Sequence, residues 1–541
     1  MSEVSAKSRY LATLVTACLA VMVAQVAYSL PGALNGTFQQ VFNTAGSQLT
    51  WISAAFAIPM VIFELTSGVV GDLFGRKRLL QGGTLLVVAG ALVSLVAHDV
   101  HVMWVGQAVS GLGAGVLFPI SLAMIAAAAP TTEARSRAIA LWAGFLSIGA
   151  ALSPLLAGLF AKYGSWRGSY VVVVAAALIT CLLAFAAADS SAPEGRRLDL
   201  PGQLTLALGL FAILYAAVQG SEKGWGRPEI VGAFVVGAAL LVAFVVIELR
   251  TEVPLLHLDL FKNRAFTVSG IVAVVGMFSF LGICFSMSIW MGAVQHQSAL
   301  KIGVLFLFIQ GPAFVLVPVV SHLIRNVSPR WVLTAGFALI AVAGIWCSTF
   351  DVQDASWTRF IPPLLVLGVG FALTVGSITA VAINTVPVRL AGMASATTNL
   401  LRDLGFALGP VVVGAVATSA ANGRLMDGLG AVVGKLTGSG ALDQAHAGAA
   451  MGISQQGGAI ALNSLPVIPG QQPVPMPAEL HTLALESLGH AYGLAFLVCG
   501  LCAAGSAALT LVGLVGAKEP ATDIDPLLEV AGVAGDVEVA S

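Results

Sequence analysis

Long runs of apolar residues dominate the chain, and short polar segments separate them. Most runs are near the roughly 20 residues that a helix needs to cross about 30 Å of hydrocarbon. The pattern predicts fourteen membrane-spanning helices, at residues 10–32, 48–70, 79–97, 102–126, 137–161, 168–188, 201–219, 229–249, 265–293, 302–324, 331–349, 358–386, 392–418 and 488–516. The first run follows Lys7 and Arg9 but lacks a small-residue cleavage site, so we expect an uncleaved span rather than a signal peptide.

Composition supports this interpretation. Of the 541 residues, 58% are hydrophobic and 9% are charged, whereas soluble domains carry about 25% charged residues. The formal net charge of −1 gives no sign of nucleic-acid binding. The sequence has no clustered metal-ligand pattern, nucleophile elbow or phosphate loop. We therefore expect an all-α integral membrane protein that is not an enzyme and needs no metal or cofactor.

The distribution of cations between loops predicts the orientation, because short cytoplasmic loops carry an excess of Lys and Arg. With both termini in the cytoplasm, the outer short loops hold only Lys162, Arg167, Lys223, Arg227, Lys301 and Arg359. The inner ones hold Arg76, Lys77, Arg78, Arg135, Arg137, Arg196, Arg197, Arg250, Lys262, Arg264, Arg325, Arg330 and Arg389. We expect a multi-pass protein of the cell (inner) membrane.

The loop between the second and third spans carries a specific motif, Gly68-x-x-x-Asp72-x-x-Gly75-Arg76-Lys77. The charge rule accounts for the cations but not for Asp72 or the two glycines. The motif resembles the gating loop of the major facilitator superfamily. The resemblance implies that Asp72 acts as a latch against the start of span 13.

Two halves of the chain repeat each other. The fifth span reads Gly149-x-x-x-Ser153-Pro154-x-x-x-Gly158, and the thirteenth reads Gly405-x-x-x-Gly409-Pro410-x-x-x-Gly414. Small residues permit close helix contact and proline kinks a helix, so we expect helix pivots at both places, with plain small-residue packing as the alternative. Parallel six-span repeats then divide the chain into a bundle at 1–188, a linker with two inserted spans at 189–264, a bundle at 265–516 and an acidic tail at 517–541. Residues 419–487 read as a long, mobile extracytoplasmic loop with one short helix near 425–436.

The segments around the insert extend the resemblance over nearly the whole chain. They are Arg197-Leu-Asp-Leu-Pro-Gly202, Gly224-Trp225, Glu248-Leu-Arg250-x-x-x-Pro254 and Ala394-Ser-x-x-x-Asn399-Leu-x-Arg402-x-Leu-Gly405. Together they are similar to the EmrB/QacA-type 14-span drug:proton antiporters. The resemblance implies two six-helix bundles related by a pseudo-twofold axis, and export of small hydrophobic or amphipathic compounds in exchange for protons.

Three positions depart from that family. Met22 stands where the first span normally carries an aspartate, and Gln107 stands where the fourth carries an arginine. Both charges belong to the usual proton-coupling apparatus. His322 stands roughly where the second-half copy of the loop would carry its aspartate.

Three charged residues lie well inside predicted spans, away from their ends, where a charge costs at least about 2.5 kcal/mol and usually marks function. Glu64 lies near the middle of span 2, and Arg402 and Asp403 lie in span 13. We expect Glu64 to have taken over proton coupling, with Arg402 as its partner across the interface between the bundles. The alternatives are a fixed structural bridge and a local pair between Arg402 and Asp403.

A substrate pocket is expected near the midplane between the bundles. The candidates share polar, aromatic or thioether side chains suited to varied apolar ligands: Gln25, Tyr28, Gln107, Met287, Trp290, Met291 and Gln310. The expected partners are a small-molecule substrate, protons and the lipid bilayer, and the expected state is a monomer. The competing functional hypothesis is a protein of the same fold that binds or senses a ligand, or transports it without proton coupling.

Overall fold

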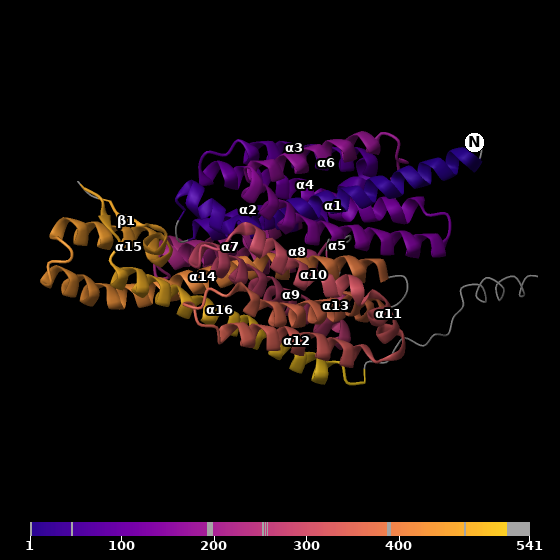
Figure 1. Cartoon of the computed structure of the whole chain (residues 1–541). Helices are drawn as coiled ribbons and strands as arrows, with labels where there is room; N and C mark the ends of the chain where they lie inside the picture. The colour runs from indigo at the N-terminus through magenta and orange to yellow at the C-terminus, as the bar shows by residue number, and fades with distance from the viewer. Residues whose placement is uncertain are drawn as a thin grey trace, which may run out of the picture.

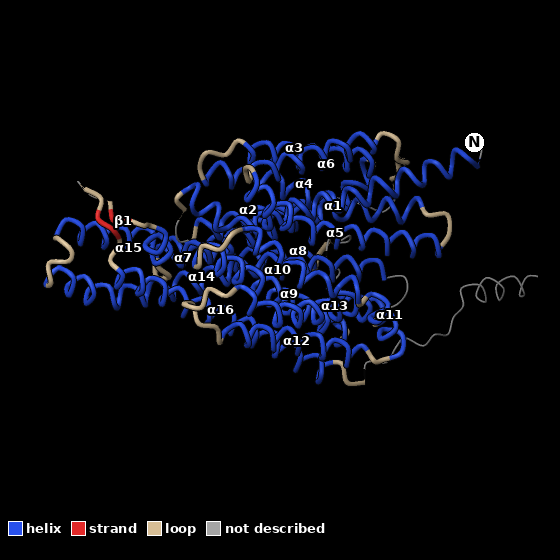
Figure 2. Tube along the Cα trace, in the orientation of Figure 1, coloured by secondary structure: helices blue, strands red, loops and turns tan. Residues whose placement is uncertain are grey.

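The computed structural model describes residues 3–44, 47–191, 199–251, 254, 256, 258–386, 391–469 and 472–516. Helices make up almost all of these residues (Figures 1 and 2). The predicted tail at 517–541, Arg196, Arg197 and Arg389 lie outside the described residues. The all-α membrane fold predicted from the sequence is confirmed.

Six helices form the N-terminal bundle, namely α1 (Glu3–Phe42), α2 (Gln48–Phe74), α3 (Arg76–Leu95), α4 (Val100–Ala128), α5 (Thr132–Tyr163) and α6 (Arg167–Ala184). The inserted pair is α7 (Leu200–Lys223) and α8 (Pro228–Glu248). The α2 helix bends by 50° between Glu64 and Thr66. Ser67 Oγ donates to the Glu64 carbonyl at 3.0 Å and to Gly115 O at 2.9 Å, and such hydroxyl bonds to the helix backbone often accompany bends.

The C-terminal bundle starts after η1 (Leu258–Lys262) and contains α9 (Arg264–Ile289) with its π-helical end η2 (Trp290–Val294), α10 (Ala299–Val315), α11 (Val317–Asn326), α12 (Pro329–Ser348), η3 (Trp357–Phe360), α13 (Ile361–Asn384), α14 (Ala391–Gly438) and α16 (Ala478–Gly513). The predicted tenth span is broken into α10 and α11. His322 lies on α11, where its side chain is exposed and beside Asn326.

Each of the fourteen predicted spans coincides with a helix, but they do not all qualify by length and composition. Among the described residues, twelve helices are long and apolar enough to cross a membrane, or thirteen if the bent α2 counts as one span. The exception is α10, which is apolar but short because of the break before α11.

Residues 419–487 are not the mobile loop predicted from the sequence. Both α14, with 48 residues, and α16, with 36, continue well past the length of a span. Between them lie α15 (Gln444–Ser464) and a hairpin of β1 (Val467–Ile468) and β2 (Val474–Pro475). We call residues 419–487 the extension, because they project beyond the bundles (Figure 1). The glycine and alanine content misled the prediction, since small residues here pack helices closely instead of leaving them disordered.

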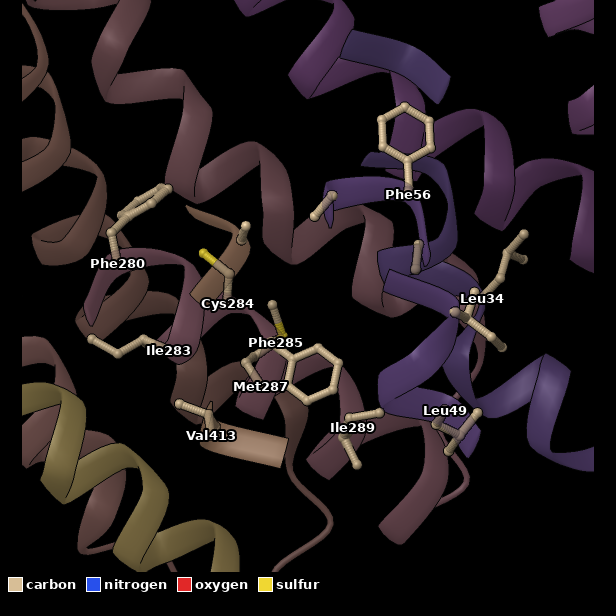
Figure 3. Close-up of a cluster of buried hydrophobic side chains, with 14 of the residues drawn as sticks. Leu34, Leu49, Phe56, Phe280, Ile283, Cys284, Phe285, Met287, Ile289 and Val413 are labelled. Carbon is tan, nitrogen blue, oxygen red and sulfur yellow. The ribbon is translucent and has the colours of Figure 1, made fainter. Parts of the chain in front are cut away.

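The two bundles share one continuous core of buried side chains. Figure 3 shows part of this core, with Leu34 of α1 and Phe56 of α2 on one side and Phe285 of α9 and Val413 of α14 contributed by the other bundle. The bundles therefore meet through packed apolar surface in this state.

Candidate functional site

The motif loop fastens the end of α2 to α4 and α6. Arg76 donates to Asp72 Oδ1 through Nη2 at 2.7 Å and through Nε at 3.0 Å, and both side chains are largely buried. Gly75 has φ of +100°, a conformation that favours glycine. Lys77 Nζ donates to Phe185 O at 2.6 Å and to Ala187 O at 3.1 Å, just past the end of α6. A cation at the C-terminal end of a helix offsets its free carbonyls.

Gly68, the first residue of the motif, lies one helical turn before Asp72 and is partly exposed. A Cβ added to Gly68 would meet nothing within 4 Å. The start of α14, against which the latch was predicted, falls on residues whose side chains lie outside the described set. The latch role of Asp72 stays a prediction.

The two repeated glycine motifs pack in the same way. In α5, Gly149 lies against Met22 O of α1, and Ser153 Oγ donates to Val26 O at 2.8 Å. In α14, Gly405 lies against Val274 O of α9, and Gly409 lies near Gly282 N. The first two small residues of each motif thus hold the helix against the first helix of its own bundle.

The last glycine of each motif instead contacts the opposite bundle. A Cβ on Gly158 would lie 2.5 Å from Leu300 Cα of α10, and one on Gly414 would clash with Thr50 of α2. Next to the prolines, Gly303 of α10 packs against Pro154 O of α5. Pro410 occupies the equivalent position of α14. Small residues therefore let the bundles approach through their backbones here.

These interbundle contacts lie toward the end that carries the extension. On α10, Gly303 packs tightly on α5, whereas two turns further on a Cβ at Gly311 would meet nothing within 4 Å. On α5, Gly158 is tight and Gly144 likewise has open space. The two helices separate toward the end of the bundles that carries Gly75. The described state is closed at the extension end.

A polar contact that the sequence analysis missed contributes to this closure. Asn35 of α1 is fully buried and its Nδ2 donates to Ser288 Oγ of α9 at 2.9 Å, and Ser288 Oγ in turn donates to Gly32 O. One turn beyond Gly32 and Ser288, the two helices are just as close, since a Cβ at Gly36 would lie 2.8 Å from Gly292 Cα. Ser288 is a polar residue inside a predicted span, but Asn35 lies beyond residue 32, where the first span was predicted to end, so the sequence pattern did not point to this pair.

The structure brings Glu64, Arg402 and Asp403 together at the interface between α2 and α14. Arg402 Nε donates to Asp403 Oδ1 at 3.2 Å, and these side chains are 21% and 11% exposed. Glu64 lies within electrostatic range of both of them. Its Oε2 is buried without a hydrogen-bond partner. The local pair between Arg402 and Asp403, weighed as an alternative, is therefore present, and the role of Glu64 in proton coupling stays a prediction.

Tyr28 adds a third helix to this charged cluster. Asp403 acts electrostatically on Tyr28 from α14. The Tyr28 hydroxyl is buried without a hydrogen-bond partner, and its ring packs on Phe56, with centroids 5.4 Å apart. We call Tyr28, Glu64, Arg402 and Asp403 the interface cluster. Buried polar groups without partners are rare and need an explanation.

The other predicted pocket residues separate into two groups. Gln25 and Gln310 are partly exposed, and Gln25 Nε2 donates to Ser29 Oγ at 2.8 Å. Met287, Trp290 and Met291, by contrast, are fully buried. Trp290 packs on Phe496 of α16, inside the C-terminal bundle. These three residues fill the closed end in this state and do not line an accessible pocket.

Gln107 also lies away from the interface. It is buried within the N-terminal bundle, where Nε2 donates to Tyr170 Oη of α6 at 3.1 Å and to Ser94 Oγ of α3 at 3.3 Å. Its assignment to the pocket is therefore wrong for this state. A position on a span does not reveal which face the side chain occupies, and α4 is apolar on all sides.

Two helical bundles, with buried charges where they meet, define a polytopic membrane protein of the kind that moves solutes. The sequence profile of the major facilitator superfamily matches residues 17–410. The chain belongs to the major facilitator superfamily.

Relatives and solved structures agree with this assignment. The multidrug resistance protein Stp of Mycobacterium tuberculosis is 27% identical over 379 residues, covering 70% of each chain. The puromycin resistance protein pur8 of Streptomyces alboniger is 29% identical over 400 residues, covering 72% of this chain and 78% of that one. A bacterial homologue of the lysosomal transporter Spinster, solved in an inward-facing and unoccupied conformation, has a TM-score of 0.61 at 14% identity, covering 96% of this chain and all of that one. These relatives confirm the resemblance to drug-resistance transporters of the superfamily.

Proposed function

We propose that this protein exports small hydrophobic or amphipathic compounds by alternating access, and that proton entry through Glu64 drives the export. The names of Stp and pur8 support a role in resistance to toxic compounds. The contacts at the extension end support one of the two states that alternating access requires. In the proposed orientation the protein lies in the cell inner membrane with both termini in the cytoplasm, so the described state faces inward.

The interface cluster is the observation that carries the proposal. It contains two carboxyl groups and one guanidinium, contributed by both bundles, with Arg402 already paired to Asp403. Binding of one proton makes the cluster electrically neutral. A buried charge without a partner is costly, so the protonation of Glu64 is tied to how closely Arg402 approaches.

Rocking of the bundles supplies the coupling step. Glu64 lies directly before the bend of α2, and Arg402 lies three residues before Gly405, which packs α14 on α9. Motion of one bundle therefore changes the separation of the carboxylate and the guanidinium. Tyr28, Gln25 and Gln310 are the proposed contacts for a substrate, because they lie on helices that contact the opposite bundle and are not fully enclosed.

Dye efflux from cells, with and without a protonophore, tests the function. Wild-type efflux should stop when the protonophore is added. The isosteric Glu64→Gln variant should lose uphill efflux, still bind dye, and show residual flux that does not respond to pH. Glu229→Gln, at an exposed acid on α8, is the matched control and should pump normally. Normal, pH-dependent pumping by Glu64→Gln would rule out Glu64 as the proton carrier.

The second candidate is ligand binding or transport without proton coupling. Met22 and Gln107 favour it, since both replace charges used by similar antiporters, and Gln107 is committed to bonds inside its own bundle. Efflux that resists the protonophore would support uncoupled transport. Unaltered retention across a broad panel of dyes would support a binding or sensing role.

A further inference from the structure

A groove lies at the base of the extension, on the outside of the C-terminal bundle. Its volume is about 430 Å³, within the range of sites for small molecules. The end of α12 and the following residues, α14 and α16 form its walls. At Gly489 and Gly493, α16 packs closely on Val352 and Ser348, which also line the groove.

The groove lies where three helices leave the hydrocarbon. About 20 residues cross a bilayer, and counting that far back along α16 from Gly513 reaches Leu494. Leu494 and Leu501, on one side of α16, are 37% and 56% exposed. One and two turns beyond Leu494, toward the extension, stand the exposed His490 and Glu486. The same helix face is thus apolar within the bilayer and charged directly above it.

The other two walls of the groove, α12 with its following residues and α14, also change from apolar to charged at this level. Asp351 follows the end of α12, whose 20 residues match one membrane crossing. On α14 the exposed Arg424 lies about two turns past the end of a crossing that starts at Thr397. The groove therefore brings together one guanidinium, two carboxylates and one imidazole at the membrane surface. Within the described part of the chain, neither Arg424 nor Glu486 takes part in an ion pair.

We propose that this groove binds the headgroup of a zwitterionic aminophospholipid in the adjacent leaflet. Arg424 recognises the phosphate, and Asp351 and Glu486 accept hydrogen bonds from the ammonium group. The acyl chains run along Leu494 and Leu501. An anionic headgroup without an amine fits less well, because the two carboxylates repel it.

Native mass spectrometry of the purified full-length protein tests the assignment. The protein is incubated with equal amounts of phosphatidylethanolamine, phosphatidylcholine and phosphatidylglycerol. Phosphatidylethanolamine should be retained most and phosphatidylglycerol least. Because exposed ion pairs are weak, the expected preference is about two- to fivefold.

Variants separate the two halves of the headgroup. Arg424→Gln should lower retention of all three lipids, whereas Glu486→Gln should lower phosphatidylethanolamine to the level of phosphatidylcholine. Lys162→Gln, at an exposed cation at the end of α5, is the control and should change nothing. If the Glu486→Gln variant fails to fold, Asp351→Asn provides the same test.

Two outcomes would overturn the proposal. One is equal retention of the three lipids by the wild-type protein. The other is a change in ethidium binding by the groove variants with lipid retention unaltered, which would make the groove a site for cargo. Neither outcome depends on proton-driven efflux, so the test is independent of the proposed function.

Discussion

Single small residues determine how closely the bundles approach. Gly158 and Gly414 have the same place in their motifs, and each meets the opposite bundle. Ser153 stands where the repeated motif of α14 has Gly409, yet it packs at zero exposure and gains a hydrogen bond to Val26 O. The substitution thus keeps the close contact with α1.

We expect Gly158→Leu to destabilise the state closed at the extension end. The larger side chain cannot fit beside Leu300, and overpacking costs about 1–3 kcal/mol, a factor of roughly 5–150 in the population of that state. Initial rates of dye efflux should fall, while the amount of protein in the membrane should not. Gly505→Leu, on the exposed side of α16, is the control. Equal efflux by both variants would show that the Gly158 contact is not needed for the cycle.

Asp72→Asn should impair efflux without affecting membrane insertion. The variant removes the charged partner of Arg76, and hydrogen bonds to charged groups contribute about 1.5–3 kcal/mol. Quantitative immunoblots of membranes alongside dye efflux measure the two effects. Asp259→Asn makes the same change at an exposed ion pair with Lys262 and should be neutral. Normal efflux by a well-expressed Asp72→Asn protein would remove the latch interpretation.

At the level of elements, the sequence predicted the helices well and their surroundings poorly. Apolar runs identified every span because hydrocarbon thickness fixes their length. They could not reveal that α14 and α16 continue into the extension, since beyond the membrane only packing decides. Glu64 and Arg402 were found because charges are rare in spans. Gln107 and Trp290 were misplaced because nearly uniform apolarity hides which face of a helix meets its bundle.

The extension contains a histidine with an acceptor at each ring nitrogen. His446 Nδ1 lies 2.8 Å from Asp443 Oδ1, and Nε2 lies 2.7 Å from Gln472 O. The Gln472 carbonyl and then the Asp443 carboxylate raise the pKa of His446, and bonds from the His446 backbone and ring lower the pKa of Asp443. Both ring nitrogens can donate only in the imidazolium form.

The sign of the pH effect follows from these two shifts. A raised histidine pKa stabilises the folded extension below about pH 6.5, and this contribution is lost as the pH rises through the higher folded value. The lowered pKa of Asp443 matters only in acid, where its contribution is lost as the pH falls. Hydrogen exchange across residues 443–469 should therefore be slower at pH 5.5 than at pH 8.5, after correction for intrinsic rates. His446→Gln should abolish the difference, and an unchanged difference would exclude His446 as its source.

At the scale of the whole molecule, three contacts between the bundles hold the extension end closed. Glycines of α5 and α10 pack on the backbone of the facing helix, Gly414 of α14 packs on Thr50 of α2, and Asn35 bonds to Ser288 between α1 and α9. The extension adds a fourth, because Gln39 Nε2 of α1 donates to Ile460 O of α15 at 3.4 Å, while Asn463 of α15 donates to Val294 O at 3.0 Å. Opening at this end has to break the Gln39 contact or carry α15 along.

Water-requiring thiol labelling tests which end is open. Gly311→Cys should react quickly with a maleimide in the resting protein, because a Cβ at that position would meet nothing within 4 Å. Ala299→Cys, on the same helix but buried at the closed end, should react slowly. Measurements should use a background without the six native cysteines. Faster labelling at Ala299 than at Gly311 would indicate that the resting state faces the other way.

The fourth contact between the bundles has a pharmacological consequence. In the proposed orientation α15 lies on the extracytoplasmic side of the membrane and contacts both bundles. A nanobody or cyclic peptide that binds α15 and α1 together would hold the protein in the state closed at the extension end. Such an agent would not have to cross the membrane in which the protein lies, and it would not enter the cytoplasm, from which the proposed transport removes compounds.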